Sequence, residues 1–443
     1  MNPCLLDLVD ELKLYADENG LPIIPPDKWR EMNENYKKQD IKDALARYIV
    51  TEKPKFPFRE IKESEVVNKF QKFCADDCNK FIISGEALKQ RDVLEKYDDY
   101  KYPFNEYGFG LIQFGHYYND VSNFFQQENR LSCGSYGFAA PLEIWKDEAL
   151  LQKMNYTFWR LGNTQVGLHN WRGSFRLGAY VATQFKPHVA KSIYQITNAK
   201  VVMDTSCGWG DRLAGFYASD AEEFFGCDPN ENVFEMYKKQ CIWYEKQLGC
   251  DKPYIHEADN YFYCSGKKQV TLFRKPAEDV DWIAICPPRG VDCMFTSPPY
   301  FSTELYNKGG ENEQDQSWSR YNEYDKWREG FFFPMLRQVW PVIKDKGFVF
   351  VNIMDPVIKG TRYRTCDELV DFMGDELNAS FLGQIGMRIK QRPKKMETGL
   401  NEFLTKDFIE NIWCFSKNNG IITLNNNATL ESLMGDDDNE LFN

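Results

Sequence analysis

AKVVMDTSCGWG, at residues 199–210, gives the clearest indication of the fold. An apolar run ends at Asp204, a turn with two glycines follows, and a helical pattern begins near Asp211. Glycines at such a turn let the backbone approach a ligand where side chains would collide. The segments DRLAGFYAS, EEFFGCDPN, ENVFEMYKKQCIWYEKQL and PYIHEADN then continue the alternation of helix and strand. This alternation predicts a parallel, doubly wound α/β sheet.

The same alternation extends toward the C-terminus. The pattern predicts strands over Asp292–Phe295 and Gly347–Asp355, helices over about Tyr324–Val342 and Cys366–Leu377, and a closing pair of strands near residues 380–390 and 410–416.

The first part of the chain has a different pattern. Amphipathic helical stretches alternate with prolines over the first 100 or so residues, and the aromatic-rich segment Tyr102–Trp171 could be irregular or partly β. We therefore predict a mostly helical accessory region over residues 1–170, the α/β domain over residues 171–420 and an acidic tail over residues 421–443.

Two acidic residues accompany the glycine turn. Asp228 ends the next apolar run, at the spacing expected for a carboxylate that accepts hydrogen bonds from ribose hydroxyls. Leu213 replaces the third glycine of the dinucleotide fingerprint, which favours a nucleoside ligand. Asp259 follows the expected third strand, where it could accept a hydrogen bond from an adenine amine or cap a helix. For the glycine turn and Asp228, the alternative interpretation is a sharp strand–helix turn and an ordinary Asp-Pro-Asn turn without a ligand.

A second turn, TSPPYF at residues 296–301, ends another predicted strand. Its two prolines remove backbone donors and fix φ, which leaves a stiff turn. The Ser297 hydroxyl and the Pro298 carbonyl can accept the two hydrogens of an amino group, and Tyr300 can stack on a planar ring. Both turns are expected at the same edge of the sheet, because the carboxyl ends of parallel strands lie together.

These motifs together resemble the S-adenosylmethionine-dependent amino-methyltransferases of DNA, which methylate the exocyclic nitrogen of adenine or cytosine. The resemblance implies a Rossmann-like sheet with an antiparallel last strand and S-adenosyl-L-methionine as the cofactor. Phe185-Lys186-Pro187 is similar to an additional cofactor motif of the family, and a core phenylalanine before a helix is the alternative. The predicted catalytic residues are Ser297, Pro298, Pro299 and Tyr300, and the predicted cofactor contacts are Phe185, Asp204, Ser206, Gly208, Gly210, Asp228 and Asp259.

The variant with serine before the prolines favours N4 of cytosine in DNA as the target, with N6 of adenine as the alternative. RNA and protein-glutamine methyltransferases also use a Pro-Pro-Tyr turn, and a non-catalytic module with a decayed core is a further alternative. Target recognition is expected from residues 1–170, from the polar loop Ser302–Asn322, or from a basic stretch near the C-terminus.

Charge restricts where DNA could bind. The net charge of −12 argues against binding a polyanion through the average field of the surface. MRIKQRPKKM, at residues 387–396, contains no acidic residue, and it is either a local DNA contact or a solvated basic loop. The candidate DNA contacts are Arg388, Lys390, Arg392, Lys394 and Lys395.

Cysteine and histidine usage predicts no metal site, since the four histidines lie far apart and the 13 cysteines are expected to be reduced thiols. No apolar run approaches the roughly 20 residues of a membrane helix, and the N-terminus lacks the basic start of a secretion signal. We therefore expect no membrane contact and an intracellular location, cytoplasmic or nucleoid-associated.

Overall fold

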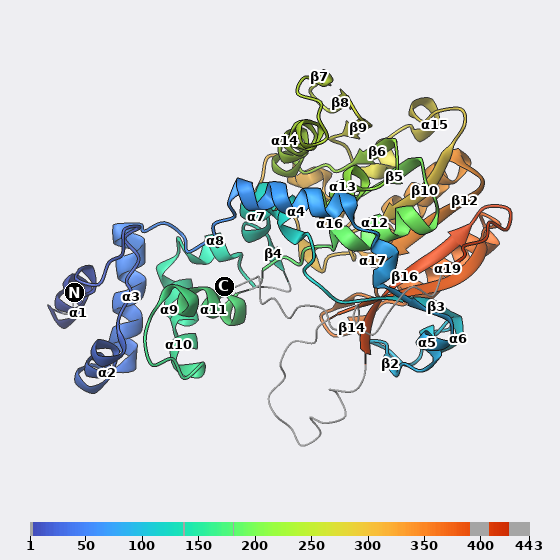
Figure 1. Ribbon diagram of the computed structural model, residues 1–443. Coiled ribbons are helices and arrows are strands. Elements are labelled where there is room, and N and C mark those ends of the chain that lie inside the picture. Colours follow the sequence, from blue (N-terminus) through green and yellow to red (C-terminus); the bar gives the residue numbers. More distant parts are fainter. Residues whose placement is uncertain (1–2, 136–137, 180, 390–406, 425–443) are drawn as a thin grey trace.

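The computed structural model describes residues 3–135, 138–179, 181–389 and 407–424 (Figure 1). Its centre is a sheet whose principal strands follow the order β9-β6-β5-β10-β12-β16-β15. These strands are β5 (Val201–Asp204), β6 (Glu223–Cys227), β9 (Gln269–Phe273), β10 (Val291–Thr296), β12 (Ile343–Asn352), β15 (Ser380–Arg388) and β16 (Asp407–Ser416). The first five in this order pair in parallel, whereas β16 is antiparallel to both of its neighbours. The predicted doubly wound α/β sheet with an antiparallel last strand is confirmed.

Helices cover both faces of this sheet. They are α12 (Pro187–Ile196), α13 (Asp211–Ala218) and α14 (Glu231–Gln247) on one face, and α15 (Trp282–Ile285), α17 (Tyr324–Trp327), a π-helical turn (Arg328–Phe332), α18 (Phe333–Val339) and α19 (Thr365–Asp375) on the other. Val202 of β5 packs in the first core, and its neighbour Met203 packs in the second. Both side chains are fully buried, which explains why this strand appears in the sequence as a continuous apolar run.

The N-terminal part of the chain extends the sheet, a feature that the sequence pattern did not predict. β3 (Gly108–Ile112) pairs in parallel with β15, and β1 (Ile82–Ser84) pairs with β3. α4 (Glu63–Ala75) and α7 (Asn119–Leu131) contribute Val66 and Val121 to the same core as α13. β1 has only three residues and β3 contains two glycines, so neither carries the alternation by which a strand is recognised.

Another group of helices encloses a core of its own and lies to one side of the sheet in Figure 1. This group consists of α1 (Pro3–Lys13), α2 (Pro26–Asn35), α3 (Lys38–Glu52), α8 (Pro141–Ile144), α9 (Glu148–Asn155), α10 (Thr157–Arg160) and α11 (Leu168–Gly178). The buried Trp171 of α11 donates a hydrogen bond to the carbonyl of Pro22 at 3.0 Å. The predicted boundary at residue 170 therefore does not follow the packing, because it cuts through α11 and assigns α4 and α7 to the wrong side.

The third parallel strand also differs from the prediction. PYIHEADN, expected to be that strand, forms the exposed β7 (Tyr254–Ala258), which pairs antiparallel with β8 (Tyr261–Ser265). The strand beside β6 is β9, later in the chain. The hairpin of β7 and β8 is thus inserted in the chain between α14 and β9, the strand that continues the parallel sheet.

The remaining elements are short. They are a 3-10 turn (Cys78–Phe81), α5 (Gly85–Lys89), β2 (Val93–Leu94), α6 (Phe104–Tyr107), β4 (Gly134–Ser135), a 3-10 turn (Ala277–Asp279), β11 (Glu304–Leu305), a 3-10 turn (Glu313–Asp315), α16 (Ser317–Arg320), a 3-10 turn (Trp340–Val342), β13 (Val357–Ile358) and β14 (Thr361–Arg362).

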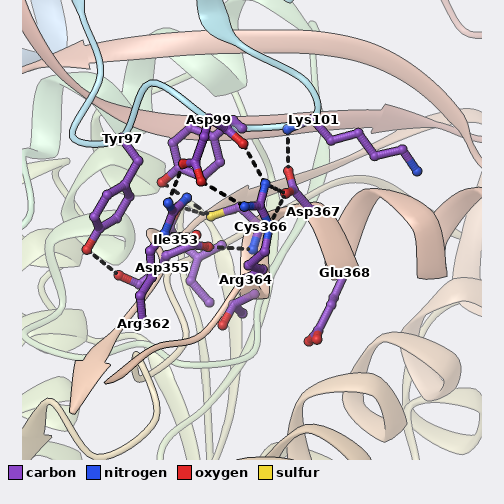
Figure 2. Close-up of polar contacts among 12 residues, drawn as sticks. Tyr97, Asp99, Lys101, Ile353, Asp355, Arg362, Arg364, Cys366, Asp367 and Glu368 are labelled. Atoms are coloured by element: carbon purple, nitrogen blue, oxygen red, sulfur yellow. Dashed lines mark hydrogen bonds and ion pairs between the residues drawn. The ribbon is translucent and has the colours of Figure 1, made fainter. Parts of the chain in front are cut away.

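A polar cluster beyond the end of β12 joins the N-terminal part of the chain to the sheet (Figure 2). Asp355, which is buried, accepts hydrogen bonds from the backbone N–H of Cys366 at 2.9 Å and from Nε of Arg362 at 2.8 Å. The Arg362 guanidinium lies 3.7 Å from the centre of the Tyr97 ring and also pairs with Asp99. Asp355 therefore anchors the segment around residue 97 to the loop that follows β12.

We expect Asp355→Ala to lower the free energy of unfolding by about 3 kcal/mol, because it leaves a partly buried guanidinium and a buried N–H without their acceptor. Urea denaturation measures the change. Glu323→Ala is the control, since Glu323 pairs with Lys326 and the two side chains are 64% and 62% exposed. This control should change the free energy by less than about 0.5 kcal/mol. Equal losses in the two variants would contradict the anchoring role.

Candidate functional site

The glycine turn after β5 is held in shape from two sides. Gly208 and Gly210 have φ of +56° and +71°, in the left-handed region that favours glycine. A Cβ atom at Gly210 would lie 2.4 Å from Oε1 of Gln240, so a larger residue there would displace the Gln240 side chain in addition to the strain of its positive φ. The buried carboxylate of Asp204 accepts hydrogen bonds from the Ser206 backbone N–H at 3.1 Å and from Nε of Arg212 at 2.8 Å. Asp204 thus fixes the turn from behind.

Asp228 connects this turn to the end of β6. Its carboxylate accepts hydrogen bonds from the backbone N–H groups of Gly208 and Asn230, both at 3.0 Å. Burial raises the pKa of Asp228 to about 6, and these two hydrogen bonds act in the opposite direction. The two turns therefore form one rigid unit with a carboxylate at its centre.

A cavity opens at the carboxyl ends of β5, β6 and β10, beside this unit. Its lining includes Thr205, Ser206, Gly208, Trp209, Asp228, Asn230, Ala277, Glu278, Ser297, Pro299, Tyr306 and Phe331. Three predicted cofactor contacts, Ser206, Gly208 and Asp228, line it directly. Asp204 and Gly210 lie behind the turn, where they shape it. A cavity with a carboxylate and a glycine turn at the strand ends suits a nucleoside ligand.

The Pro-Pro-Tyr turn after β10 is braced by β12. Oδ1 of Asn352 accepts a hydrogen bond from the Ser297 hydroxyl at 3.2 Å and lies 3.3 Å from the hydroxyl oxygen of Tyr300. The single proton of the Tyr300 hydroxyl is donated to the nearer acceptor, Oε1 of Glu410 on β16. Two side chains from distant parts of the chain therefore fix the serine and the tyrosine ring.

A second cavity adjoins the first and is lined by this turn. Its lining includes Gln184, Phe185, Gly208, Trp209, Arg212, Ser297, Pro298, Tyr300, Glu304, Tyr306, Asn352, Met354, Met387 and Glu410. Four residues border both cavities: Gly208, Trp209, Ser297 and Tyr306. A ligand in one cavity would thus lie next to a ligand in the other, an arrangement suited to group transfer between two molecules.

Phe185 lies in the wall of the second cavity. The guanidinium carbon of Arg212 lies 5.0 Å from the centre of its ring, and the Phe295 ring lies edge-on at 5.5 Å. Arg212 in turn pairs with Asp204. Phe185 and the glycine turn, predicted from separate motifs, are therefore joined through one arginine.

Asp259 does not reach this site, and its predicted placement was wrong. It lies in the exposed turn between β7 and β8 and lines neither cavity. The inserted hairpin is the reason, because the segment that reaches the first cavity follows β9 instead. Ala277 and Glu278 of that segment line the cavity.

The predicted DNA contacts fall at the edge of the described residues. Arg388 ends β15, and its Nε lies 2.6 Å from Oδ1 of Asp407. This carboxylate offsets the charge of Arg388. Lys390, Arg392, Lys394 and Lys395 lie outside the described residues.

Several lining residues have no counterpart among the residues predicted from the sequence. Asn352 ends the run GFVFVN, and the rule that ligands bind at strand ends could have identified it. Glu410 lies in no recognisable motif, and Met387 begins the basic stretch that was predicted to contact DNA. The antiparallel pairing of β15 with β16 brings both to the cavity.

The strand order defines a Rossmann-like α/β fold, with two adjoining cavities at the carboxyl ends of its parallel strands. Residues 291–440 match the family model described as DNA methylase. This match begins at β10, includes the TSPPY turn, and confirms the resemblance predicted from the sequence.

The chain also has similarity to several solved structures. The precorrin-6y C5,15-methyltransferase of Geobacter metallireducens is 12% identical, with a TM-score of 0.30 over 53% of this chain and 87% of that chain. TrmN from Thermus thermophilus is 9% identical, with a TM-score of 0.30 over 52% and 48%. Trm1 from Pyrococcus horikoshii, solved with S-adenosyl-L-methionine, is 15% identical, with a TM-score of 0.32 over 54% and 57%. The chain thus spans about half of TrmN and Trm1. The fold class rests on the strand order, because these TM-scores are low.

A comparison with curated protein sequences gives no match. Over the described residues, no helix is both long and apolar enough to cross a membrane. In the same part of the chain, no three His, Cys, Asp or Glu side chains gather as a metal site would require.

The DNA methylase match over residues 291–440 supports S-adenosyl-L-methionine, the cofactor that the sequence motifs predict. The first cavity fits its nucleoside part, since Gly208 places no side chain in the lining and the Asp228 carboxylate can accept hydrogen bonds from hydroxyls.

We expect cofactor affinity to fall below pH 6. The pKa of Asp228 is about 6, and only the ionised carboxylate accepts hydrogen bonds with both oxygens. The dissociation constant for S-adenosyl-L-methionine, measured by calorimetry, should rise about tenfold from pH 8 to pH 5. Asp228→Asn should bind about tenfold more weakly at pH 8 and lose most of this pH dependence.

Asp259→Asn is the matched control, because it changes an exposed aspartate outside the cavity. It should keep both the affinity and the pH dependence of the natural protein. A pH dependence that survives in Asp228→Asn would remove Asp228 from the cofactor site.

Proposed function

We propose that the protein transfers a methyl group from S-adenosyl-L-methionine to the exocyclic amino group of a base in DNA, with N4 of cytosine as the target. The observation that carries this proposal is the junction of the two cavities at Ser297, where a glycine turn and a Pro-Pro-Tyr turn meet. The DNA methylase match over residues 291–440 supports DNA as the substrate. Serine in place of an acidic residue before the prolines favours cytosine, and N6 of adenine is the second candidate.

In this proposal the first cavity holds the cofactor, with contacts from Ser206, Gly208 and Asp228. Asp204 and Gly210 position the turn, and Phe185 bounds the side toward the second cavity. When bound, the cofactor supplies a methyl group on a positively charged sulfur, which is a good leaving group.

The second cavity would hold the target base, turned out of the helix. Ser297 and the Pro298 carbonyl accept the two hydrogens of the amino group and thereby direct its nitrogen toward the first cavity. Pro299 stiffens the turn, and the Tyr300 ring stacks on the base. Asn352 holds the hydroxyl of Ser297, so the acceptor geometry is in place before the base arrives.

The other parts of the chain have roles that remain predictions. Residues 1–170 and the loop Ser302–Asn322 are candidates for target recognition, and the basic stretch at residues 387–396 is the candidate contact with phosphates. The intracellular location also remains a prediction.

The test is mass spectrometry of nucleosides from DNA incubated with the protein and S-adenosyl-L-methionine that carries a deuterated methyl group. We expect labelled N4-methylcytosine. Labelled N6-methyladenine would select the second candidate. A protein that binds the cofactor but labels no nucleoside in DNA would contradict the proposal, and RNA and protein would then be tested as acceptors.

We expect Tyr300→Ala to lower labelling roughly 10- to 100-fold, since stacking of a base on an aromatic ring contributes about 1–3 kcal/mol. Tyr254→Ala, at a tyrosine that is 65% exposed on β7, is the matched control and should be fully active. Cofactor binding by calorimetry checks that both variants are folded.

A further inference from the structure

Glu410 accepts a hydrogen bond from Tyr300 of the Pro-Pro-Tyr turn, and nothing in the sequence motifs assigns it a role. It lies on β16, opposite Met387 of β15, and both side chains line the second cavity. Ser297, Pro298 and Tyr300 line the same cavity. A base held by its amino group at this turn would therefore lie beside Glu410.

The hydrogen bond from Tyr300 decides how the carboxyl group of Glu410 can act. The tyrosine hydroxyl donates to Oε1, which is therefore an acceptor. In a neutral carboxyl group the proton would then be on Oε2. Such a group accepts from Tyr300 with one oxygen and donates to a ligand with the other.

The surroundings of Glu410 shift its titration toward the neutral form. Burial raises its pKa, and the hydrogen bond from Tyr300 and the charge of Lys96 lower it to a smaller extent. Asn352 and Lys186 act in the same direction as Lys96. Burial also lowers the pKa of Lys186 to about 8, which weakens its effect in alkaline solution.

Two other charged side chains line the cavity. Arg212 is paired with Asp204, and Glu304 lies on β11. Glu304 carries the same negative sign as an ionised Glu410, so it disfavours ionisation.

We propose that Glu410, as a neutral carboxylic acid, donates a hydrogen bond to the ring nitrogen beside the amino-bearing carbon of the target base. This atom is N3 of cytosine or N1 of adenine, and the inference rests on the proposed function. Both nitrogens carry a lone pair and no hydrogen, so they accept the O–H. In an ionised Glu410, a lone pair of the carboxylate oxygen would face the lone pair of the ring nitrogen, and the two would repel each other.

The first test is the pH dependence of kcat/KM on a DNA oligonucleotide. Activity of the natural protein should fall as the pH rises through the pKa of Glu410, because the donor is lost. Glu410→Gln supplies an N–H donor at every pH, so it should stay within about threefold of the natural protein at low pH and lack this fall. Glu410→Ala should be roughly 10- to 100-fold less active.

The second test replaces the ring nitrogen of the target base with carbon, as 3-deazacytosine or 1-deazaadenine. This change should lower kcat/KM of the natural protein roughly 10- to 100-fold. It should have no further effect in Glu410→Ala, because that variant has already lost the interaction. A Glu410→Ala variant that loses as much activity as the natural protein on the deaza base would overturn the inference.

The controls separate this inference from the proposed function. Calorimetric binding of S-adenosyl-L-methionine checks that each variant is folded, and Glu222→Gln, at a side chain that is 65% exposed, should behave as the natural protein.

If the natural protein methylates no base, the proposed function fails. If it methylates DNA and Glu410→Ala is equally active, only the role of Glu410 fails. An inactive Glu410→Gln that still binds the cofactor would show that the carboxylate is required, which contradicts a neutral donor.

Discussion

β5 and β10 run parallel, with Val202 opposite Cys293 and Met203 opposite Met294, and this pairing fixes where both functional turns lie. Both strands end at the same edge, where the hydroxyls of Thr205 and Thr296 lie 3.1 Å apart. From β5 the chain continues to β6 on one side, while β10 lies on the other, so a crevice opens between the turns. Without this pairing, the glycine turn and the Pro-Pro-Tyr turn would be two unrelated loops.

The wall of the second cavity depends on strands from both ends of the chain, which extend the sheet beyond β12. β16 lies between β12 and β15 and brings Glu410 beside the turn. Behind it, Asn411 donates a hydrogen bond to Glu95 at 2.7 Å, and Glu95 accepts another from the Phe104 backbone N–H at 2.7 Å. The cluster around Asp355 anchors the same N-terminal segment to the end of β12. The N-terminal part of the chain is therefore structural support for the site, besides its predicted role in recognition.

Local motifs allowed much of the first cavity to be predicted, because a strand, a turn and a helix follow one another within a few residues. The glycine turn, Asp228 and the TSPPY turn are of this kind. Asp259 was misplaced because the inserted hairpin has the apolar pattern of a strand, and a pattern does not reveal its partner. Asn352 reaches the turn through the pairing of β12 with β10, and Glu410 reaches it through the pairing of β16 with β12, 52 and 110 positions beyond Tyr300. The end of its strand marks Asn352 in the sequence, whereas a pairing at the separation of Glu410 leaves no local trace in a single sequence.

The loop between β10 and α17 couples the two cavities to the N-terminal part of the chain. Tyr306 of this loop borders both cavities, and its ring lies edge-on to Trp209 at 5.8 Å. Trp318 donates a hydrogen bond to the Tyr306 carbonyl at 2.8 Å. Just before Tyr306, β11 pairs with β4 of the N-terminal part. Because β11 has only two residues, this pairing is small compared with the central sheet, and it ends one residue before Tyr306. The loop that borders both cavities is therefore attached to a segment that lies about 170 residues earlier in the chain.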